Sequence, residues 1–506
     1  MNAALLLANQ AAKSPSATAL IQDQQRISYQ QLEKRTGHLA GALLAAGLNP
    51  GDRVALLFHN CPALVEVYFA AIRVGLVATP VNFRLVGREM AHILNDSGAK
   101  ALFMGAEFAE TIATIEEDLE EHPLFVTQGK QHHLDSLDYD DFVEKGSYSP
   151  FSEDIKEDQP CQLMYTSGTT GRPKGAVISH RNIIWNLFNT IHGREDKEGQ
   201  ISIIVGPLYH TAALNNHLTI QLALGGVSIL VKKFEPGQML KIIEKEKATV
   251  ISGSPAMYNL LLQHPKAAQA DTRSIEKCTS GADKLPLATK KRLMEFLPGI
   301  HGIYDVYGCT EASPCITILK AKDSLIKDVS VGTALPFLQA VVADEDSNPL
   351  PPGEVGELIC RGPNVMAGYH NQPRATEEAL RQGWLHTGDL ARMDQDGFFY
   401  IVDRKKDMIV SGGENIYPRE VEEVLFAHPD VADVAVVGIP DEMWGESVKA
   451  FLVLRNGKEL SSEEVIEYCK RHLASYKKPK LVQFIKDMPR NASGKTLKNR
   501  LRKWGE

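Results

Sequence analysis

A stretch of eleven residues in the first half of the chain, YTSGTTGRPKG at positions 165–175, combines glycines, hydroxyl side chains and a lysine. Glycines let backbone N–H groups approach a polyphosphate closely, and hydroxyls donate hydrogen bonds to its oxygens. The lysine adds a positive charge. The composition therefore predicts a phosphate-binding loop, made by Thr166, Ser167, Gly168, Thr169, Thr170, Gly171 and Lys174.

A Walker A loop is the nearest competing interpretation, because it also cradles phosphates. It requires G-x-x-x-x-G-K-[ST] between a strand and a helix. Counted from Gly168, Pro173 occupies the place of the second glycine, and the flanking CQLMY and GAVIS both resemble strands. The GKT at 494–496 fails as well, because Pro489 occupies the place of its first glycine. Neither lysine belongs to a standard P-loop.

Composition indicates a globular protein. The chain has 506 residues, of which 43% are hydrophobic and 23% charged, which is enough to bury large cores. A net charge of −8 gives no support to a nucleic-acid partner or an anionic membrane surface. The seven cysteines form no CxxC pair, which favours a reducing, cytoplasmic compartment. The apolar runs are shorter than the ~18 residues of a transmembrane segment, and the N-terminus lacks the basic region of a signal peptide.

The elements that must position these residues alternate between helix and strand. Residues 27–47 predict a helix that ends at Gly47, and strand, helix and strand patterns follow over 52–81. This rhythm predicts parallel sheets covered by helices, an α/β fold. From about residue 332 short strands and turns predict a small β-barrel-like subdomain.

A second, compact α+β pattern follows the charged sequence DRKKD at 403–407. Pro418 is predicted to open a helix, and Ser461 with Glu464 forms a capping box. We therefore predict a large N-terminal body (1–403), a hinge (404–407) and a small mobile C-terminal domain (408–506).

YTSGTTGRPKG resembles the signature loop of the adenylate-forming superfamily. This superfamily includes acyl-CoA synthetases, aryl-CoA ligases, luciferases and the adenylation domains of peptide synthetases. Six further blocks resemble those of the superfamily in the same order: PLYH (207–210), SGA (280–282), YGCTE (307–311), HTGDL (386–390), DRKKDMIVSGGENIYPREVE (403–422) and NASGK (491–495). The resemblance covers nearly the whole chain. It implies that ATP and Mg²⁺ convert a carboxylic acid to acyl-AMP, which coenzyme A then attacks.

The resemblance also implies roles at the nucleotide. Glu311 would help to hold Mg²⁺ as a hard oxygen ligand, and Thr310 would bond a phosphate. Asp389 would accept hydrogen bonds from both ribose hydroxyls, and Arg404 would contact ribose or phosphate. Relatives often have an amide where this chain has Asp305, although a carboxylate could still accept the N6 proton. The residues expected around adenine are Gly281, Ala282, Asp305, Tyr307 and Gly308.

Other implied roles concern the acid and the thiol. His210 would lie beside the reacting carboxylate, polarising it or moving aside for the thiol. An ammonium group such as that of Lys495, with an ordinary pKa near ~10.4, stays charged and would offset repulsion between the carboxylate and the α-phosphate. In the family this lysine lies on a C-terminal domain that rotates between half-reactions. With Lys406 as pivot, the other orientation would present Gly412 and Gly413 to the pantetheine arm.

The residues indicate the substrate class less directly than they indicate the reaction. The candidate pocket residues are mostly small or apolar, which favours a medium- or long-chain fatty acid over an aryl or alicyclic acid; they are Leu214, Asn215, Gly281, Val306 and Cys309. Amino-acid activation is disfavoured, because PLYHTAALNN offers no acidic partner for a buried ammonium. An acyl-AMP ligase that does not use CoA, a luciferase-type oxygenase and an inactive homologue are weaker alternatives. Homodimers are common in the family.

Overall fold

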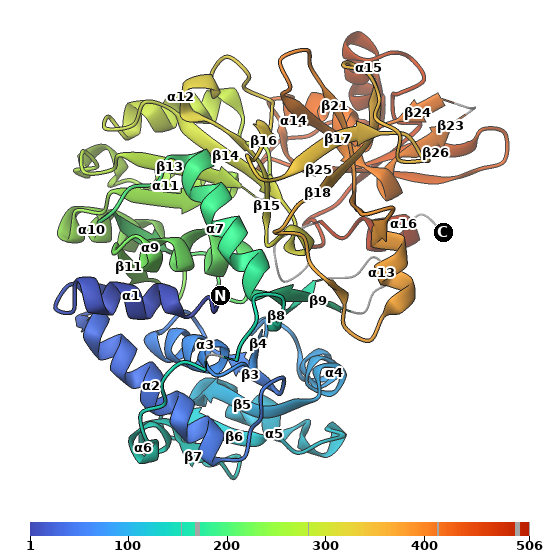
Figure 1. Cartoon of the computed structure of the whole chain (residues 1–506). Helices are drawn as coiled ribbons and strands as arrows, with labels where there is room; N and C mark the ends of the chain where they lie inside the picture. Colours follow the sequence, from blue (N-terminus) through green and yellow to red (C-terminus); the bar gives the residue numbers. More distant parts are fainter. Residues whose placement is uncertain (153, 167–172, 282, 412–413, 491–495, 505–506) are drawn as a thin grey trace. The chain divides into compact units, whose positions relative to one another are not determined.

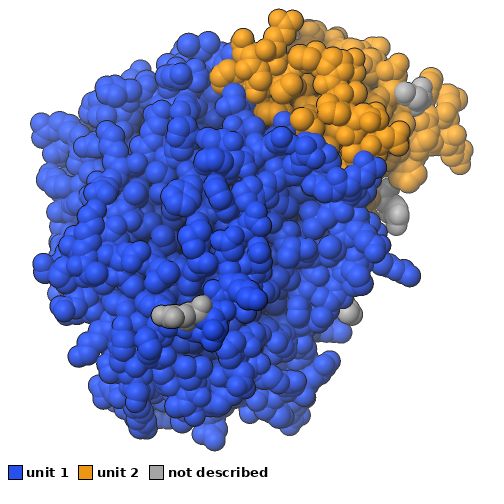
Figure 2. All heavy atoms as spheres, in the orientation of Figure 1, with its two compact units in different colours: residues 1–340, 360–385 blue, residues 341–359, 386–506 orange. Residues whose placement is uncertain are grey.

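The computed structural model describes residues 1–506 except 153, 167–172, 282, 412–413, 491–495 and 505–506. The chain forms two compact units, shown in different colours in Figure 2. Unit 1 contains residues 1–340 and 360–385, and unit 2 contains residues 341–359 and 386–506. Each unit has its own core, so each is described separately.

The first sheet of unit 1 has nine strands, and it is parallel in its centre with antiparallel edges (Figure 1). Its order is β16 (Thr333–Ala334), β15 (Cys315–Leu319), β14 (Ile303–Gly308), β13 (Lys277–Gly281), β12 (Val250–Gly253), β10 (Ile201–Ile204), β11 (Val227–Leu230), β1 (Thr18–Gln22) and β2 (Gln25–Ser28). Strands β14 to β1 run parallel, as the alternating pattern predicts.

The second sheet of unit 1 has eight strands and a similar design. Its order is β19 (Gly368–Tyr369), β9 (Lys174–Ser179), β8 (Pro160–Thr166), β4 (Val77–Pro80), β3 (Arg53–Leu57), β5 (Ala99–Gly105), β6 (Leu124–Gln128) and β7 (Leu137–Asp138). Strands β8 to β7 are parallel, whereas β9 and β19 pair antiparallel at one edge. That antiparallel edge carries the predicted phosphate loop.

Helices fill the space around and between these sheets. Helix α2 (Tyr29–Ala45) is capped by Ser28 and buries Leu32 and Leu39, as its apolar spacing predicts. The chain leaves it through Gly47 at φ +89°, a conformation that favours glycine. Every residue of α3 (Pro62–Arg73) is buried, in a core that includes residues of both sheets.

The remaining helices of unit 1 are α1 (Leu5–Lys13), α4 (Gly87–Ser97), α5 (Ala109–Ala113), α6 (Tyr139–Lys145), α7 (His180–Arg194), α8 (Thr211–Ala213), α9 (Thr219–Ala223), α10 (Pro236–Glu246), α11 (Pro255–Gln263), α12 (Leu287–Phe296) and α13 (Pro373–Ala379). No helix within the described residues is long and apolar enough to cross a membrane.

The segment after about residue 332, which was predicted to form a small β-barrel-like subdomain, forms a five-stranded sheet. It contains β17 (Gln339–Ala343), β18 (Val355–Arg361), β21 (Trp384–Met393), β20 (Leu380–Arg381) and β22 (Phe399–Arg404). The chain passes from one unit to the other within β17, β18 and β21.

The rest of unit 2 is the expected α+β structure. Its sheet contains β24 (Glu414–Ile416), β23 (Ile409–Ser411), β26 (Gly445–Leu454), β25 (Val431–Asp441) and β27 (Leu481–Phe484). Helix α14 (Pro418–Phe426) begins at the predicted proline, and α15 (Ser462–His472) has the predicted capping box; α16 (Lys498–Lys503) follows. The fold class, a large α/β body with a smaller α+β domain, is therefore confirmed. The boundary at 403–408 stays a prediction, because it concerns which segment moves.

Candidate active site

The predicted phosphate loop connects two antiparallel strands, as expected from its flanks. Thr166 at the end of β8 pairs with Lys174 at the start of β9. Helix α7 begins only at His180, where the Ser179 hydroxyl accepts from the N–H of Asn182. This strand–loop–strand arrangement excludes a Walker A loop. The loop residues Ser167, Gly168, Thr169, Thr170 and Gly171 lie outside the described residues.

Tyr369 lies between two of the predicted site residues. Its strand β19 pairs with β9, which places Tyr369 opposite Ala176. The Tyr369 hydroxyl donates to Oε1 of Glu311 at 2.6 Å, and Lys174 Nζ lies 5.3 Å from the centroid of the Tyr369 ring. Burial raises the pKa of Tyr369, and the Glu311 carboxylate raises it further. Tyr369 therefore stays a neutral donor, and the structure brings Lys174 and Glu311 together around it.

Glu311 and Thr310 share a 3₁₀ turn, Thr310–Ala312, directly after β14. The N–H of Met366 donates to the Glu311 carbonyl at 2.8 Å, which ties this turn to the segment before β19. No cluster of three or more metal-ligating side chains occurs among the described residues. A single carboxylate nevertheless fits Mg²⁺, since this ion keeps several waters and binds substrate phosphates through one or two carboxylates.

The residues expected around adenine follow two neighbouring parallel strands. Gly281 of β13 pairs with Val306 of β14, and Ser280 pairs with Asp305. A Cβ atom on Gly281 would lie 3.3 Å from the Val306 carbonyl oxygen, and one on Gly308 would lie 1.8 Å from that of Pro314. Only glycine therefore fits at 308 without a backbone shift.

Three further residues are expected around adenine, and they differ in their surroundings. Asp305 is ion-paired with Lys290, with 2.5 Å between Oδ2 and Nζ. Tyr307 is half-buried in the same strand, whereas Ala282 lies outside the described residues.

The acyl-side residues come from the segment after β10. His210 precedes α8, and its ring centroid lies 4.4 Å from that of Tyr209. A π-helical turn, Leu214–Leu218, follows, and such turns occur frequently at functional sites. Of the predicted pocket residues, Val306 and Cys309 are half-buried, whereas Leu214 and Asn215 are fully buried.

Asn215 is held in a buried polar network. Its amide exchanges two hydrogen bonds with Gln162 of β8, at 2.8 and 3.1 Å, and donates to the Ser313 carbonyl at 3.3 Å. The Gln162 amide also donates to the hydroxyl of Tyr68 in α3 at 2.6 Å. These bonds tie the π-helical turn to β8 and α3 in the interior.

In unit 2, Asp389 and Arg404 face each other across β21 and β22. Arg404 Nε lies 2.7 Å from Oδ1 of Asp389. The two predicted ribose residues are therefore brought together by strand register. Asp389 is buried and Arg404 is exposed, so a buried carboxylate lies beside a cation that faces solvent.

Glu357 of β18 bonds to residues that neighbour this pair in the chain. Its buried carboxylate accepts from the N–H of Gly388 at 3.0 Å, from Nδ1 of His386 at 3.1 Å and from Nζ of Lys405 at 3.2 Å. Burial alone would raise the pKa of Glu357, but the bonds from His386 and Lys405 hold it below its ordinary value. Glu357 thus fixes the residues next to both Asp389 and Arg404.

The predicted pivot lies in a short 3₁₀ turn, Lys405–Asp407, with Lys406 exposed. Both ends of this joint are anchored: Asp403 accepts from the N–H of Arg419 at 2.8 Å, and Asp407 pairs with Arg502 at 2.8 Å. The remaining predicted residues, Gly412, Gly413 and Lys495, lie outside the described residues.

Sequence reasoning missed Tyr369, Glu357 and Lys290. Each contacts a predicted residue, or the neighbour of one, that lies 15 or more positions away in the chain. The only local signals were GY at 368–369 and GEL at 356–358, which carry no chemistry by themselves.

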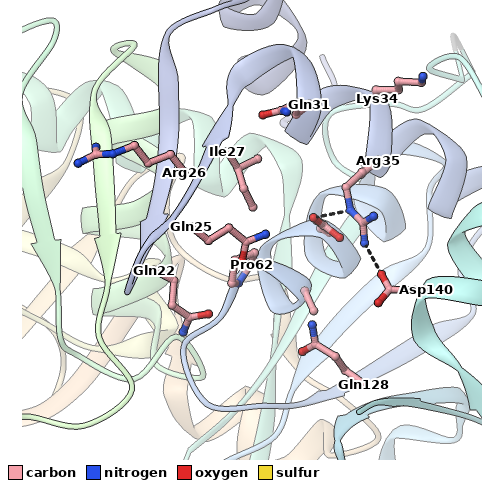
Figure 3. A pocket seen from close by; sticks show the side chains of 12 residues that line it. Gln22, Gln25, Arg26, Ile27, Gln31, Lys34, Arg35, Pro62, Gln128 and Asp140 are labelled. Atoms are coloured by element: carbon pink, nitrogen blue, oxygen red, sulfur yellow. Dashed lines mark hydrogen bonds and ion pairs between the residues drawn. The ribbon is translucent and has the colours of Figure 1, made fainter. Parts of the chain in front are cut away.

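A cavity of about 510 Å³ near β2 and α2 contains none of the predicted site residues (Figure 3). Its lining includes Gln25, Gln128 and Arg35. The Arg35 guanidinium pairs with the carboxylates of Glu66 at 2.8 Å and Asp140 at 3.0 Å, so these charged groups of the cavity form ion pairs with one another. It is separate from the residues discussed above.

Comparison with known proteins decides the family. Residues 7–370 match the model for AMP-binding enzymes, and residues 420–495 match the model for the C-terminal domain of AMP-binding enzymes. The chain belongs to the AMP-binding enzyme family. The resemblance to adenylate-forming enzymes is thereby confirmed, and the protein is an AMP-forming acid–thiol ligase.

Its named relatives differ in the acid they use. The chain is 40% identical over 491 residues to a feruloyl-CoA synthase from an Amycolatopsis species, covering 97% of this chain and 96% of the relative. It is 34% identical to a long-chain-fatty-acid–CoA ligase from Bacillus subtilis, covering 98% and 93%. Among solved structures, o-succinylbenzoate CoA synthetase from Bacillus subtilis with its acyl-adenylate matches with a TM-score of 0.87 at 31% identity, covering 98% and 97%.

Proposed function

We propose that the enzyme activates a carboxylic acid with ATP and then transfers the acyl group to coenzyme A. In the first half-reaction a carboxylate oxygen attacks the α-phosphorus and pyrophosphate leaves, which gives acyl-AMP. In the second, the thiol loses its proton and attacks the acyl carbon, and AMP leaves. The observation that carries the proposal is the grouping of Lys174, Tyr369 and Glu311 where the phosphate loop returns to the sheet.

The residues of this chain fit the charge changes of the first half-reaction. Lys174 supplies a cation for the polyphosphate, and Thr310 supplies a hydroxyl donor. Glu311, oriented by the Tyr369 hydroxyl, would hold Mg²⁺, which neutralises phosphate charge when bound. Lys495 would add a second cation between carboxylate and α-phosphate.

We propose an aryl acid as the preferred substrate. The Gln162–Asn215 network supports a compact acid, because a long alkyl chain that passed Asn215 would break buried hydrogen bonds. The 40% identical relative acts on ferulate, by its name. A planar acid with a short side chain would require no opening behind Asn215.

A medium- or long-chain fatty acid is the second candidate. The apolar character of Leu214, Val306 and Cys309 favours it, and so does the similarity to long-chain-fatty-acid–CoA ligases.

The seven cysteines are all unpaired and six of them are buried, which supports a cytoplasmic location for either activity.

Pyrophosphate release tests both the reaction and the substrate class. Purified enzyme would be supplied with ATP, Mg²⁺ and ferulate, 4-coumarate, benzoate, octanoate or palmitate, with and without CoA. We expect release with an arylpropenoate and a CoA thioester only when CoA is present. Higher kcat/KM for octanoate or palmitate would replace the first candidate by the second, and release without any thioester product would refute the ligase.

A further inference from the structure

Three side chains of unit 2 form a hydrogen-bonded chain of a kind that the ligase reaction does not use. Ser347 lies in the turn between β17 and β18, and its Oγ is 3.2 Å from Nε2 of His386 on β21. Nδ1 of the same ring is 3.1 Å from Oε2 of Glu357 on β18. The order of hydroxyl, imidazole and carboxylate is that of a serine nucleophile, its general base and the group that orients the base.

The carboxylate determines which ring nitrogen carries the proton. Burial alone would raise the pKa of Glu357, but the bonds from His386 and Lys405 hold it below its ordinary value, so the group is ionised. Because an ionised carboxylate only accepts hydrogen bonds, Nδ1 of His386 is the protonated nitrogen. In the neutral ring Nε2 is then the acceptor, and the Ser347 hydroxyl donates to it. The basic nitrogen therefore faces the hydroxyl.

The backbone at Ser347 is held in a conformation that serine rarely adopts. Its φ is +66°, in the left-handed region. Asp344 fixes the turn, since its Oδ1 accepts from the N–H of Asn348 at 2.8 Å and its carbonyl accepts from the N–H of Ser347 at 3.2 Å. Strained residues of this kind concentrate at active sites. His386 and Glu357 are buried, whereas Ser347 is partly exposed and accessible to a small reagent.

We propose that Ser347 is a nucleophile with His386 as its general base, and that the protein hydrolyses small activated esters at this second site. The hydroxyl proton passes to Nε2 as Oγ bonds to the acyl carbon; the ester C–O bond then breaks, and the alcohol leaves with that proton. Water next gives a proton to Nε2 and attacks the acyl-serine, and Oγ recovers the proton as it leaves. The net reaction converts ester and water to carboxylic acid and alcohol.

A serine-directed probe tests the nucleophile directly. The full-length protein would be treated with a fluorophosphonate, which phosphonylates a base-activated serine and releases fluoride, and the label would be located by peptide mass spectrometry. Hydrolysis of 4-nitrophenyl acetate would be followed in parallel. We expect a label on Ser347 and slow hydrolysis, because the N–H groups of Ser347 and Asn348 already bond to Asp344, and lack of an oxyanion donor typically costs about 10²–10³-fold.

Two variants separate the nucleophile from the fold. Ser347→Gly removes the hydroxyl without strain, because glycine adopts φ +66° readily, so this variant should fold at least as stably as wild type and lose the label. Glu357→Gln should slow labelling by about 10²-fold or more, since an amide can donate to Nδ1 and favour the wrong tautomer. Labelling rates would be normalised to the folded fraction, measured by circular dichroism.

Ser252→Ala is the matched control. The Ser252 hydroxyl also lies near a histidine, with Oγ 3.3 Å from Nδ1 of His217, but that nitrogen also contacts Nη1 of Arg194 at 3.2 Å. Burial lowers the pKa of His217 to about 3, so this ring is a poor base. Ser252→Ala should be labelled at the wild-type rate. Ser347→Gly should release pyrophosphate within about 2-fold of wild type, because Ser347 is none of the residues assigned to the ligase.

The outcomes distinguish this inference from the proposed function. Absence of any label, labelling of other residues only, or an equal label in Ser347→Gly would overturn it. A label on Ser347 whose rate is unaffected by Glu357→Gln would also overturn it, because the hydroxyl would then react without the histidine and carboxylate. If Ser347 is labelled as expected but wild type releases no pyrophosphate with any acid, the proposed ligase function fails and this inference stands.

Discussion

At the scale of single residues, Tyr369 has the most direct link to the chemistry. Its hydroxyl donates to Glu311 and its ring faces the Lys174 ammonium. A cation near an aromatic face is attracted to the ring, and a carboxylate that accepts a hydrogen bond has fewer orientations. Tyr369 therefore orients the proposed metal ligand without supplying a charge of its own.

Replacing Tyr369 by Phe should weaken Mg²⁺ use. Loss of a hydrogen bond to a metal ligand typically costs 10–100-fold in metal affinity, so we expect a rise of about 10-fold in the Mg²⁺ concentration for half-maximal pyrophosphate release. Tyr139→Phe is the matched control, because the Tyr139 hydroxyl also donates to a carboxylate, Glu66, at 2.6 Å. Equal Mg²⁺ dependence in the two variants would contradict the role of Tyr369.

At the scale of elements, β18 joins two functional segments through Glu357. One bond goes to the Gly388 N–H on β21, next to Asp389, and another goes to Lys405, next to Arg404. A carboxylate with three donors around it is a rigid anchor. The register of β21 against β22 then sets the distance between Asp389 and Arg404.

Glu357→Gln should weaken AMP binding. The amide keeps the size of the side chain but loses the charge, so the His386 and Lys405 donors are only partly satisfied. We expect the Kd for AMP to rise several-fold and the free energy of unfolding to fall by ~1–3 kcal/mol. Glu422→Gln, which also removes a carboxylate paired with a lysine (Lys498, 2.8 Å), should reduce stability but leave the AMP Kd unchanged. Unchanged AMP affinity in Glu357→Gln would refute the anchor.

The start of helix α7 makes stability depend on pH. His180 accepts from the N–H of Ala3 at 3.0 Å, and burial lowers its pKa from 6.5 to about 4. Because the folded pKa lies below the unfolded value, the unfolded chain takes up the proton first as the pH falls. The stability contributed by neutral His180 is complete above about 6.5 and is lost progressively between about 6.5 and about 4.

Urea denaturation at pH 7.5 and pH 5 measures this effect. We expect wild type to lose ~1–2 kcal/mol of unfolding free energy at the lower pH. His180→Gln, whose amide oxygen can still accept from Ala3, should lose less. An equal loss in both proteins would assign the pH dependence to other groups.

At the scale of the whole molecule, the proposed reaction has two half-reactions with opposite needs. Adenylation brings two anions together and requires a cation, whereas thioester formation requires a path for a thiol. Lys495 and Gly413 would serve these steps in turn if the segment after the hinge rotates about Lys406. Asp403 and Asp407, at the ends of that joint, both contact residues of the segment after it, Arg419 and Arg502.

Lys495→Ala should separate the half-reactions. Loss of one preorganised cation typically lowers the rate by 10²–10³, so we expect pyrophosphate release to fall by about that factor. Thioester formation from supplied acyl-AMP should stay within about 3-fold of wild type, and Gly413→Trp should show the opposite pattern. Lys478→Ala removes a half-buried lysine of the same segment, whose Nζ donates to the Ser475 carbonyl, and should affect neither step. Equal loss of both steps in Lys495→Ala would refute alternation.

Patterns within short stretches of sequence were sufficient for the local structure. The strands around the phosphate loop, helix α2 and the capping box of α15 are set by neighbouring residues, and the structure confirms them. The seven sequence blocks, which occur in the same order as in the superfamily, were sufficient to identify the family. Burial of Leu214 and Asn215 was not foreseen, because a π-helical turn and a partner on β8 decide it.

By itself, therefore, the sequence determined the elements, the family and the types of side chain available for chemistry. Only the tertiary structure decided which of them meet. Tyr369 reaches Glu311 because β19 adds to the edge of β9, and Lys290 reaches Asp305 because α12 packs against β14. Such contacts depend on strand order and helix packing, which bring together residues that no local pattern connects.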